Sequence, residues 1–372
     1  MSRFGSQEVA GVLTGSFDPV WAADLYYAGD RRQANIPLSD VSFDEDADAE
    51  IQQSGSCTVT WSDEFATSLT PTEVTDPLAP FGAQLQVFSV IRVGSFEERV
   101  QYGWFEIVDV PDARDEIMRF RGEWITTGST VQLDLRELLY GPSKETFDAP
   151  RAPESLLSVW DEIGRVSGLP LSRTVADAPI PRSVMHPEKK LEAITNLLDI
   201  VLDAAPHMTA DGALSARPNT WPEPVAELTR EKELVHVGSM MSAEDVYNRV
   251  VVRAIDDDAE GVLAVAEVTK GPLRVRNPDG SVSPFRARTL YLKNELVNTE
   301  ALARAWAAST LSQVSTPRAQ ILPVTEVFNP LRERGDVVTI ERPNRTLLGR
   351  VATINRGMAR TQDLTVEIAG EA

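Results

Sequence analysis

Between about Val20 and Leu139, apolar and polar residues alternate or form apolar runs of strand length. Clear examples, each bounded by Gly, Ser, Pro or Asp, are SCTVTWSD, AQLQVFSVIRV, VQYGWFEIVDV and STVQLDLREL. Apolar residues also lie on both sides of Ala28-Gly29-Asp30, which predicts a hairpin turn. A series of short antiparallel strands in one stretch predicts a β-barrel or sandwich.

The apolar spacing changes to three or four residues after about residue 150. It predicts an amphipathic helix between Pro153 and Val166, stopped by Gly168 and Pro170, with the apolar positions Leu156, Leu157, Trp160, Ile163 and Val166. A second helix is predicted over 187–205, ending against Pro206, with the stripe Leu191, Ile194, Leu197, Leu198, Val201 and Leu202. Two short strands around Asp211-Gly212 follow, so residues 150–220 are predicted to form a small α/β unit.

Strand patterns return from about Val235. VYNRVVVRAI and GVLAVAEVT flank the acidic residues Asp256, Asp257, Asp258 and Glu260, which we interpret as a solvated hairpin tip, and Pro278-Asp279-Gly280 predicts another turn. One helix is expected at about 298–314, with Asn298 as N-cap and one side formed by Leu302, Ala305, Trp306, Ser309 and Val314. The chain closes with four alternating strands in ILPVTEVF, GDVVTIE, LLGRVATIN and LTVEIA.

These elements predict a mainly β (α+β) protein with two antiparallel β-barrel-like domains. The first would span 1–148, including an N-terminal extension, and the second 233–372, including the helix at about 298–314. A small α/β insert at 149–232 would separate them, and the proline-rich NTWPEPV would mark its end.

The charge balance of the 372-residue chain restricts its partners. Its 36 basic and 56 acidic residues give a net charge of −20, so its field repels nucleic acid. No apolar run is long enough to span a bilayer, and MSRFGSQEVAGVLTGSF lacks the features of a secretory signal. We therefore expect a soluble protein without membrane anchoring, assembled inside a cell. Cys57 lies in an alternating strand, where we interpret it as a small buried hydrophobe.

No motif in the sequence predicts catalysis or metal binding. Asp44, Asp46 and Asp48 imitate the start of a calcium loop, but Ala49 stands where glycine is needed and Gly55 where a glutamate is needed, so a solvated loop is the better interpretation. The histidines His186, His207 and His236 show no metal-binding spacing, and we expect boundary or surface positions for them. No nucleophile elbow, P-loop or dinucleotide fingerprint occurs, and nothing singles out a catalytic carboxylate pair. We expect no enzyme, no cofactor and no metal.

Two further groups of residues are interpreted as structural. The first is the set of arginines Arg332, Arg334, Arg342, Arg345, Arg350, Arg356 and Arg360. Because Glu333, Asp336 and Glu341 lie among them, ion pairs on a barrel surface are expected, with a subunit interface as the alternative. The tryptophans Trp104, Trp124 and Trp306 are expected in the core rather than on binding surfaces.

Several longer stretches resemble the baseplate-hub family of tailed phages, as found at the tail tip of long-tailed actinobacterial phages, and the resemblance covers most of the chain. They are YYAGDRRQANIPLSDVSFDEDADAEIQQSGSCTVTW, FEERVQYGWFEIVDV with WITTGSTVQLDLRELL, AITNLLDIVLDAAPHMTADGALSARP, and EVFNPLRERGDVVTIERPNRTLLGRVATINRGM. The family implies a first barrel, an inserted helix and hairpin, and a second barrel, in that order. Many hubs also carry a C-terminal peptidase or lysozyme. This chain ends soon after LTVEIAG, so any cell-wall enzyme is expected to be another polypeptide.

The resemblance implies a homotrimer in which two barrels per subunit alternate around a ring. Such a ring joins the sixfold tail tube to the threefold tip of the virion and surrounds the DNA-ejection channel. The implied partners are the distal tail or tube protein, the tape measure protein, and tip or fibre proteins, with assembly in the host bacterial cytoplasm. The net charge of −20 adds the hypothesis that an acidic lumen discourages DNA from sticking during ejection.

Two alternatives remain open from the sequence. The chain could be another tail-tip component, such as a distal tail ring protein or a receptor-binding base, which copy number would distinguish. It could also be a carbohydrate-active enzyme on a β scaffold, which an assay on cell wall or polysaccharide would reveal.

Overall fold

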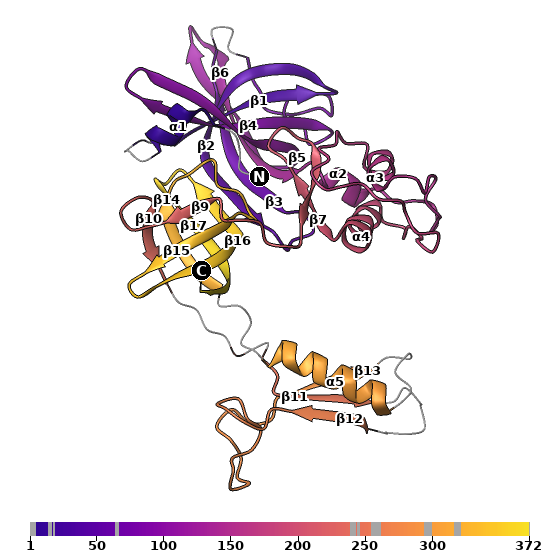
Figure 1. Cartoon of the computed structure of the whole chain (residues 1–372). Helices are drawn as coiled ribbons and strands as arrows, with labels where there is room; N and C mark the ends of the chain where they lie inside the picture. Colours follow the sequence, from indigo (N-terminus) through magenta and orange to yellow (C-terminus); the bar gives the residue numbers. More distant parts are fainter. Residues whose placement is uncertain are drawn as a thin grey trace. The chain divides into compact units, whose positions relative to one another are not determined.

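The computed structural model describes residues 5–13, 17, 19–63, 67–238, 243, 246–253, 262–293, 300–315 and 321–371 (Figure 1). Contacts within the chain divide it into two compact units. Unit 1 consists of Met1–Gly238 with Pro323–Ala372, and unit 2 of Ser239–Leu322. The predicted hairpin tip at Asp256–Glu260 and the predicted N-cap Asn298 lie outside the described residues.

The first sheet of unit 1 is closed on itself. Its strands are β1 (Val20–Tyr27), β2 (Asp30–Asp46), β3 (Gln53–Trp61), β4 (Ala83–Val93), β5 (Phe96–Phe120) and β6 (Glu123–Glu137), and the short helix α1 (Gln7–Val12) precedes them. Neighbouring strands pair in the order β1-β4-β5-β6-β3-β2, and β1 also pairs with β2, which closes the cycle. The predicted turn at Ala28-Gly29 joins β1 to β2.

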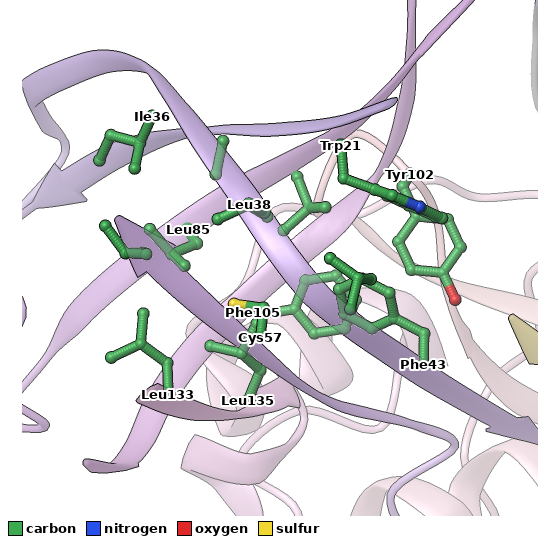
Figure 2. Packing of buried hydrophobic residues seen from close by; sticks show 14 of the residues in the cluster. Trp21, Ile36, Leu38, Phe43, Cys57, Leu85, Tyr102, Phe105, Leu133 and Leu135 are labelled. Atoms are coloured by element: carbon green, nitrogen blue, oxygen red, sulfur yellow. The ribbon is translucent and has the colours of Figure 1, made fainter. Parts of the chain in front are cut away.

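Aromatic side chains fill the inside of this first sheet (Figure 2). The rings of Trp21 and Phe43 lie 5.3 Å apart, and those of Phe43 and Tyr102 lie 4.7 Å apart. Gly55 faces the Phe43 ring, where a Cβ atom would lie 2.2 Å from a ring carbon. Cys57 is buried in the same cluster, as predicted.

The α/β part of unit 1 has its own apolar cluster, which includes Trp160, Ile163, Leu197 and Leu198. Its elements are α2 (Tyr140–Lys144), α3 (Val159–Ser167), α4 (Lys190–Leu202), β7 (Ala204–Met208) and β8 (Leu214–Pro218). β7 and β8 form the predicted hairpin.

Both predicted helices of this part are shorter in the structure. α3 begins after Ser158, whose hydroxyl caps the helix by accepting from the backbone N–H of Asp161, and it stops at the left-handed Gly168 as predicted. α4 ends at Leu202, followed by the cap residue Asp203 with φ +50°, and not against Pro206. Ala204 and Ala205 belong to β7 instead, because pairing with β8 gives their backbone groups partners.

The second sheet of unit 1 has the strand order β9-β15-β16-β17-β14-β10. Its strands are β9 (Ala226–Leu228), β10 (Leu234–Val237), β14 (Ile321–Val327), β15 (Val337–Arg342), β16 (Arg345–Gly357) and β17 (Thr361–Glu371), and the last four correspond to the predicted C-terminal strands. The end of β2, from Ser42 to Asp46, pairs with β16, so hydrogen bonds link the two sheets. The fold is mainly β, as predicted.

Unit 2 is a three-stranded sheet with a helix on one face. Its elements are β11 (Arg249–Arg253), β12 (Val262–Glu267), β13 (Thr289–Lys293) and α5 (Glu300–Val314). β11 pairs antiparallel with β12 and parallel with β13. Ala303 and Ala307 of α5 pack on Val250 and Val252, so close helix packing is confirmed.

The predicted apolar side of this helix needs correction, because Ala305 and Ser309 are exposed. The residues that pack against the sheet are Ala303, Trp306, Ala307, Leu311 and Val314. In an alanine-rich helix the sequence marks the buried side only weakly, since alanine fits either environment.

The two compact units do not test the predicted domain limits at 148 and 232, which stay predictions. No described helix is both long enough and apolar enough to cross a membrane.

Candidate functional site: the junction between the two sheets

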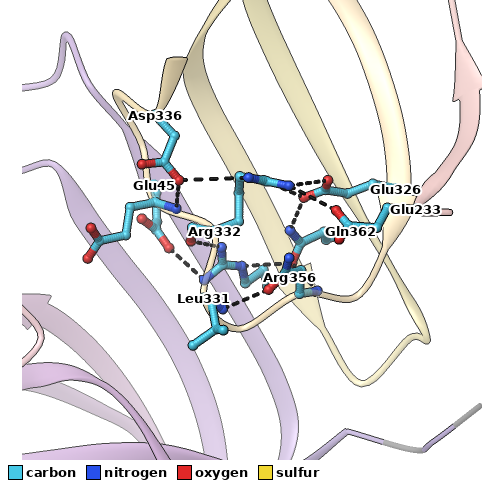
Figure 3. Close-up of polar contacts among 10 residues, drawn as sticks. Glu45, Glu233, Glu326, Leu331, Arg332, Asp336, Arg356 and Gln362 are labelled. Carbon is cyan, nitrogen blue, oxygen red and sulfur yellow. Dashed lines mark hydrogen bonds and ion pairs between the residues drawn. The ribbon is translucent and has the colours of Figure 1, made fainter. Parts of the chain in front are cut away.

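A buried network of ionised and polar side chains lies where the first and second sheets of unit 1 meet (Figure 3). Its cations are Arg332, Arg334 and Arg356, whose exposed fractions are 4%, 2% and 3%. Two of them follow β14 in the loop before β15, and the third lies on β16. The anions come from both sheets, so the network joins them.

Arg334 is the cation that reaches furthest into the first sheet. Its Nε donates to Oε1 of Gln52 at 2.9 Å, and its Nη2 donates to Oε2 of Glu137 at 3.2 Å. Its Nη1 lies 3.4 Å from Oε2 of Glu45. Glu137 also accepts from the backbone N–H of Gln52 at 2.7 Å. A loop of the second sheet is thereby fixed to three positions of the first.

Glu45 is shared between two arginines. Its Oε1 accepts from the Tyr102 hydroxyl at 3.0 Å and lies 3.0 Å from Nη1 of Arg356, an ion pair without hydrogen-bond alignment. Arg356 donates through Nε to Oε1 of Gln362 at 3.0 Å and through Nη2 to the backbone carbonyl of Arg332. Because Glu45 lies on the segment of β2 that pairs with β16, ion pairs and strand pairing coincide there.

Arg332 extends the network into the second sheet. Its Nε and Nη2 each lie 3.2 Å from the carboxylate of Glu326, and Nη2 also donates to Glu233 at 3.0 Å. Glu326 in turn accepts from Nε2 of Gln362 at 2.6 Å. Each of these buried groups therefore has a partner, which is the condition under which charges are tolerated in an interior.

Burial and charge pairing act against each other in the ionisation of these groups. Burial raises the pKa of the Glu137 carboxyl above its usual range, although the Arg334 guanidinium opposes the shift. Burial likewise raises the pKa of Glu233 despite Arg332. For Arg332, burial disfavours the cation, but Glu326, Asp336 and Glu233 together raise the pKa of its guanidinium. Such a network resists rearrangement, because moving one member leaves another charge unpaired.

The structure corrects the interpretation of the arginine set. Arg332, Arg334 and Arg356 are buried and not on a barrel surface, whereas Arg345 and Arg360 are exposed. Their main partners also come from elsewhere in the chain and not from the interleaved acids. Of those acids, Asp336 lies 4.0 Å from Nη1 of Arg332.

Sequence analysis missed the buried acids Glu45 and Glu137, although a signal for them exists. Side chains two residues apart face the same side of a strand. Glu137 therefore faces the same side of β6 as the buried Leu133 and Leu135. Glu45 faces the same side of β2 as the buried Phe43. An acid on the inward side of a strand predicts a buried cation, but not which one.

The predictions for individual histidines and tryptophans have mixed outcomes. His186 and His207 are buried, at 1% and 9% exposure, which contradicts surface positions for them, while His236 is exposed. Nε2 of His186 lies 2.7 Å from Glu162, and this contact explains why the ring can be buried.

Trp104 and Trp306 pack against apolar clusters as predicted. Trp124 is 68% exposed, so its prediction as a core residue is wrong.

The exposed acids Asp44, Asp46 and Asp48 lie at the end of β2 and just after it. Among the described residues, no group of three or more His, Cys, Asp or Glu side chains is arranged to hold a metal ion.

Comparison with known proteins gives structural neighbours but no sequence match. No family model and no curated protein matches the sequence. A tail protein from Neisseria meningitidis MC58 has a TM-score of 0.54 at 13% identity, covering 93% of this chain and 96% of that chain. The prophage MuSo2 tail protein from Shewanella oneidensis has a TM-score of 0.54 at 12% identity, with 93% and 97% covered. A chain of the half-lidded Francisella PdpA-VgrG complex has a TM-score of 0.52 at 9% identity, with 97% of this chain and 60% of that one covered.

These similarities define the fold of the chain. It is a fold that a prophage tail protein and a chain of a VgrG complex also have, over nearly the whole of the present sequence. The resemblance to phage tail proteins that the sequence predicted is thus confirmed at the level of the fold.

Proposed function

We propose that this chain is a non-enzymatic structural protein of a phage tail tip, the baseplate hub, which forms a homotrimeric ring. The observation that carries the proposal is the junction between the two sheets. Pairing of β2 with β16 and the buried contacts of Arg334 hold both sheets of one chain in a fixed relation. Two rigidly linked β modules per copy supply six ring positions from three copies, which matches a threefold tip to a sixfold tube.

The distribution of charge supports an acidic ring. Residues 239–322 hold ten basic and ten acidic side chains, which leaves 26 basic and 46 acidic residues in unit 1. The whole net charge of −20 therefore belongs to the unit that contains both linked sheets. A channel lined by this unit repels DNA, which carries about one negative charge per 1.7 Å of helix axis, and DNA would pass without specific binding.

The proposal assigns partners and a location. The ring would contact the distal tail or tube protein on one side, tip or fibre proteins on the other, and the tape measure protein near its centre. It would be assembled in the host bacterial cytoplasm and remain at the tail tip of the virion. The domain limits proposed with it are 1–148, 149–232 and 233–372, and no residue is assigned a catalytic, cofactor or metal role.

Copy number and mass test the proposal directly. Native mass measurement of the purified chain, alone and mixed with its tube protein, is expected to give a trimer, and purified virions are expected to contain three copies. Six copies per virion would favour a distal tail ring protein instead. A monomer in every sample would contradict the ring.

The enzymatic alternative has its own test. Purified chain is expected to leave cell wall and polysaccharide intact during a long incubation, measured by release of reducing sugar. Release that disappears in a carboxylate variant would contradict the structural role and favour a carbohydrate-active enzyme.

A further inference from the structure

The hairpin formed by β5 and β6 continues far beyond the closed first sheet. Pairing of β5 with β4 ends at Glu106, and pairing of β6 with β3 begins at Ser129. Between these points β5 and β6 pair with each other as far as Phe120 and Glu123. We call residues 114–127 the arm. Its longer strand, residues 114–120, extends roughly 20 Å at about 3.4 Å per residue.

The arm is exposed in a way that its composition does not explain. Every residue from Arg114 to Ile125 is exposed. Five of these are large and apolar, and their exposed fractions are 58% for Ile117, 47% for Met118, 51% for Phe120, 68% for Trp124 and 38% for Ile125. Aromatic side chains can bury about 150–250 Å² each, so the five together offer on the order of 500 Å² of apolar surface. This apolar area is divided between the two faces of the hairpin, and exposed apolar surface gathered in one short segment is a feature of interaction sites.

Both faces of the arm carry apolar side chains. Met118 pairs with Ile125, and this face also holds Phe120. The opposite face holds Ile117 and Trp124. A two-stranded hairpin is at best marginally stable in water by itself. An arm that is apolar on both faces therefore gains stability when another surface covers it.

The tip is shaped for insertion. Arg121 and Gly122 both have positive φ angles, of 50° and 94°, as a two-residue type I′ turn requires. Such a turn gives the hairpin a narrow end. The Arg121 guanidinium lies 5.2 Å from the centre of the Phe120 ring, so an apolar and a cationic group are presented together.

Charge indicates which surface the arm fits. The arm contains three arginines, Arg114, Arg119 and Arg121, and three acids, Asp115, Glu116 and Glu123, so it is neutral within a unit of net charge −20. Its turn region also carries two of the arginines. Two acidic copies of the chain repel each other in general, but a neutral arm with cations at its end is attracted to the acidic body of another copy.

We propose that the arm docks on unit 1 of a second copy of this chain, so that each copy in a closed ring gives one arm and receives one. Trp124 and Phe120 anchor the contact, and Arg119 and Arg121 face acidic groups of the neighbour. This inference rests on the ring described above, and it adds the surface through which neighbouring copies bind each other.

Covalent capture tests the contact. A photo-crosslinking benzoylphenylalanine placed at position 124 of the full chain is expected to join two copies on irradiation, with the attachment point on unit 1 of the other copy by peptide mass analysis. The matched control carries the same group at Leu157, which is 86% exposed in the α/β part and is expected to give no such product. In virions, attachment of position 124 only to a different tail protein would overturn the proposal.

A substitution supplies an independent measurement. The double variant Phe120→Ser, Trp124→Ser is expected to raise the dissociation constant of the trimer by about tenfold or more, because buried aromatic anchors dominate interfaces. Its melting temperature is expected to match that of Leu157→Ser, since all three side chains are exposed.

The outcomes separate the two proposals. If wild type and the double variant are equally stable trimers and position 124 captures no second copy, the arm proposal fails and the ring stands. If wild type is monomeric alone, with its tube protein and in virions, the ring fails and the arm proposal falls with it.

Discussion

Cys57 is the only thiol of the chain, and its surroundings keep it unreactive. It is 1% exposed within the first sheet, and burial, with the nearby Asp134 charge, raises the pKa of the thiol to about 12. Since the thiolate is the reactive form, we expect no reaction with Ellman's reagent at pH 8 in the native protein. One thiol per chain should react in 6 M guanidinium chloride. Rapid reaction of native protein would show that the first sheet opens locally.

Glu162 lies at the centre of a buried contact in the α/β part. It accepts from Nε of Arg165 at 3.0 Å and lies 2.7 Å from Nε2 of His186. Burial alone would raise the pKa of its carboxyl, but hydrogen bonds from Arg165 and His186 lower it below the usual 4.5. A carboxyl with a depressed folded-state pKa stabilises the protein above its unfolded pKa, and this stabilisation is lost as the pH falls through the folded value.

Glu162→Gln is therefore expected to destabilise the protein by about 2 kcal/mol at pH 7, since a buried hydrogen bond to a charged group contributes about 1.5–3 kcal/mol. The difference from wild type should shrink as the pH falls below about 4.5. Thermal unfolding between pH 7 and 3.5 measures it. The control Glu188→Gln, at an exposed position, should change stability by less than about 0.5 kcal/mol at every pH. A pH-independent difference for Glu162→Gln would contradict the argument.

At the scale of elements, Arg334 holds the loop before β15 against the first sheet through its contacts with Gln52, Glu45 and Glu137. Arg334→Met retains most of the side-chain volume but leaves Glu45 and Glu137 buried without this cation. Removing one partner of a buried ion pair costs about 3–5 kcal/mol, and we expect a loss of this size in urea unfolding. The control Arg345→Met, in an exposed position of β16, should cost less than about 0.5 kcal/mol. If Glu137→Gln recovers none of the loss in the double variant, the unpaired charge is not its cause.

Most elements could be predicted from the sequence, because alternation and helical spacing are local signals. Their ends were less predictable. α4 ends at Leu202 and does not continue to Pro206. The alanines after Asp203 have no strong preference for either structure, and pairing with β8 places them in a strand. The arm was missed for a related reason. The pattern in VQYGWFEIVDV predicts a strand that ends at Val110, and STVQLDLREL predicts one that begins at Ser129. In the structure β5 continues to Phe120 and β6 begins at Glu123. The charged residues between them hide the alternation.

The junction between the two sheets could be predicted only in part, because its partners are far apart in the sequence. The alternation of side chains along β2 and β6 indicates that Glu45 and Glu137 face inward. Arg334, however, is 289 residues away from Glu45 in the sequence. No local pattern connects them. A run of arginines next to acids resembles a solvated surface, and only the folded chain shows that three of them are buried between the sheets.

At the scale of the whole molecule, the chain leaves unit 1 after Gly238 and returns to it at Pro323. The backbone N–H of Gly238 donates to the carbonyl of Pro323 at 2.8 Å, and β10 pairs with β14 next to it. Gly238 and Pro323, where the two segments of unit 1 meet unit 2 in the sequence, are therefore neighbours across an antiparallel strand pair. A two-residue Asn-Gly turn has the geometry to close this hairpin without residues 239–322.

We expect unit 1 with Asn-Gly in place of 239–322 to fold independently. Its strand content by circular dichroism should persist, and its melting temperature should lie within about 4 °C of wild type, a shift that corresponds to roughly 1 kcal/mol for a protein of this size. A second variant, joined by six Gly and Ser residues, separates strain in the turn from loss of unit 2. A fall of more than about 10 °C in both variants would mean that unit 1 depends on unit 2. The arm lies in unit 1, so the excised protein should still form trimers if the arm alone joins the copies.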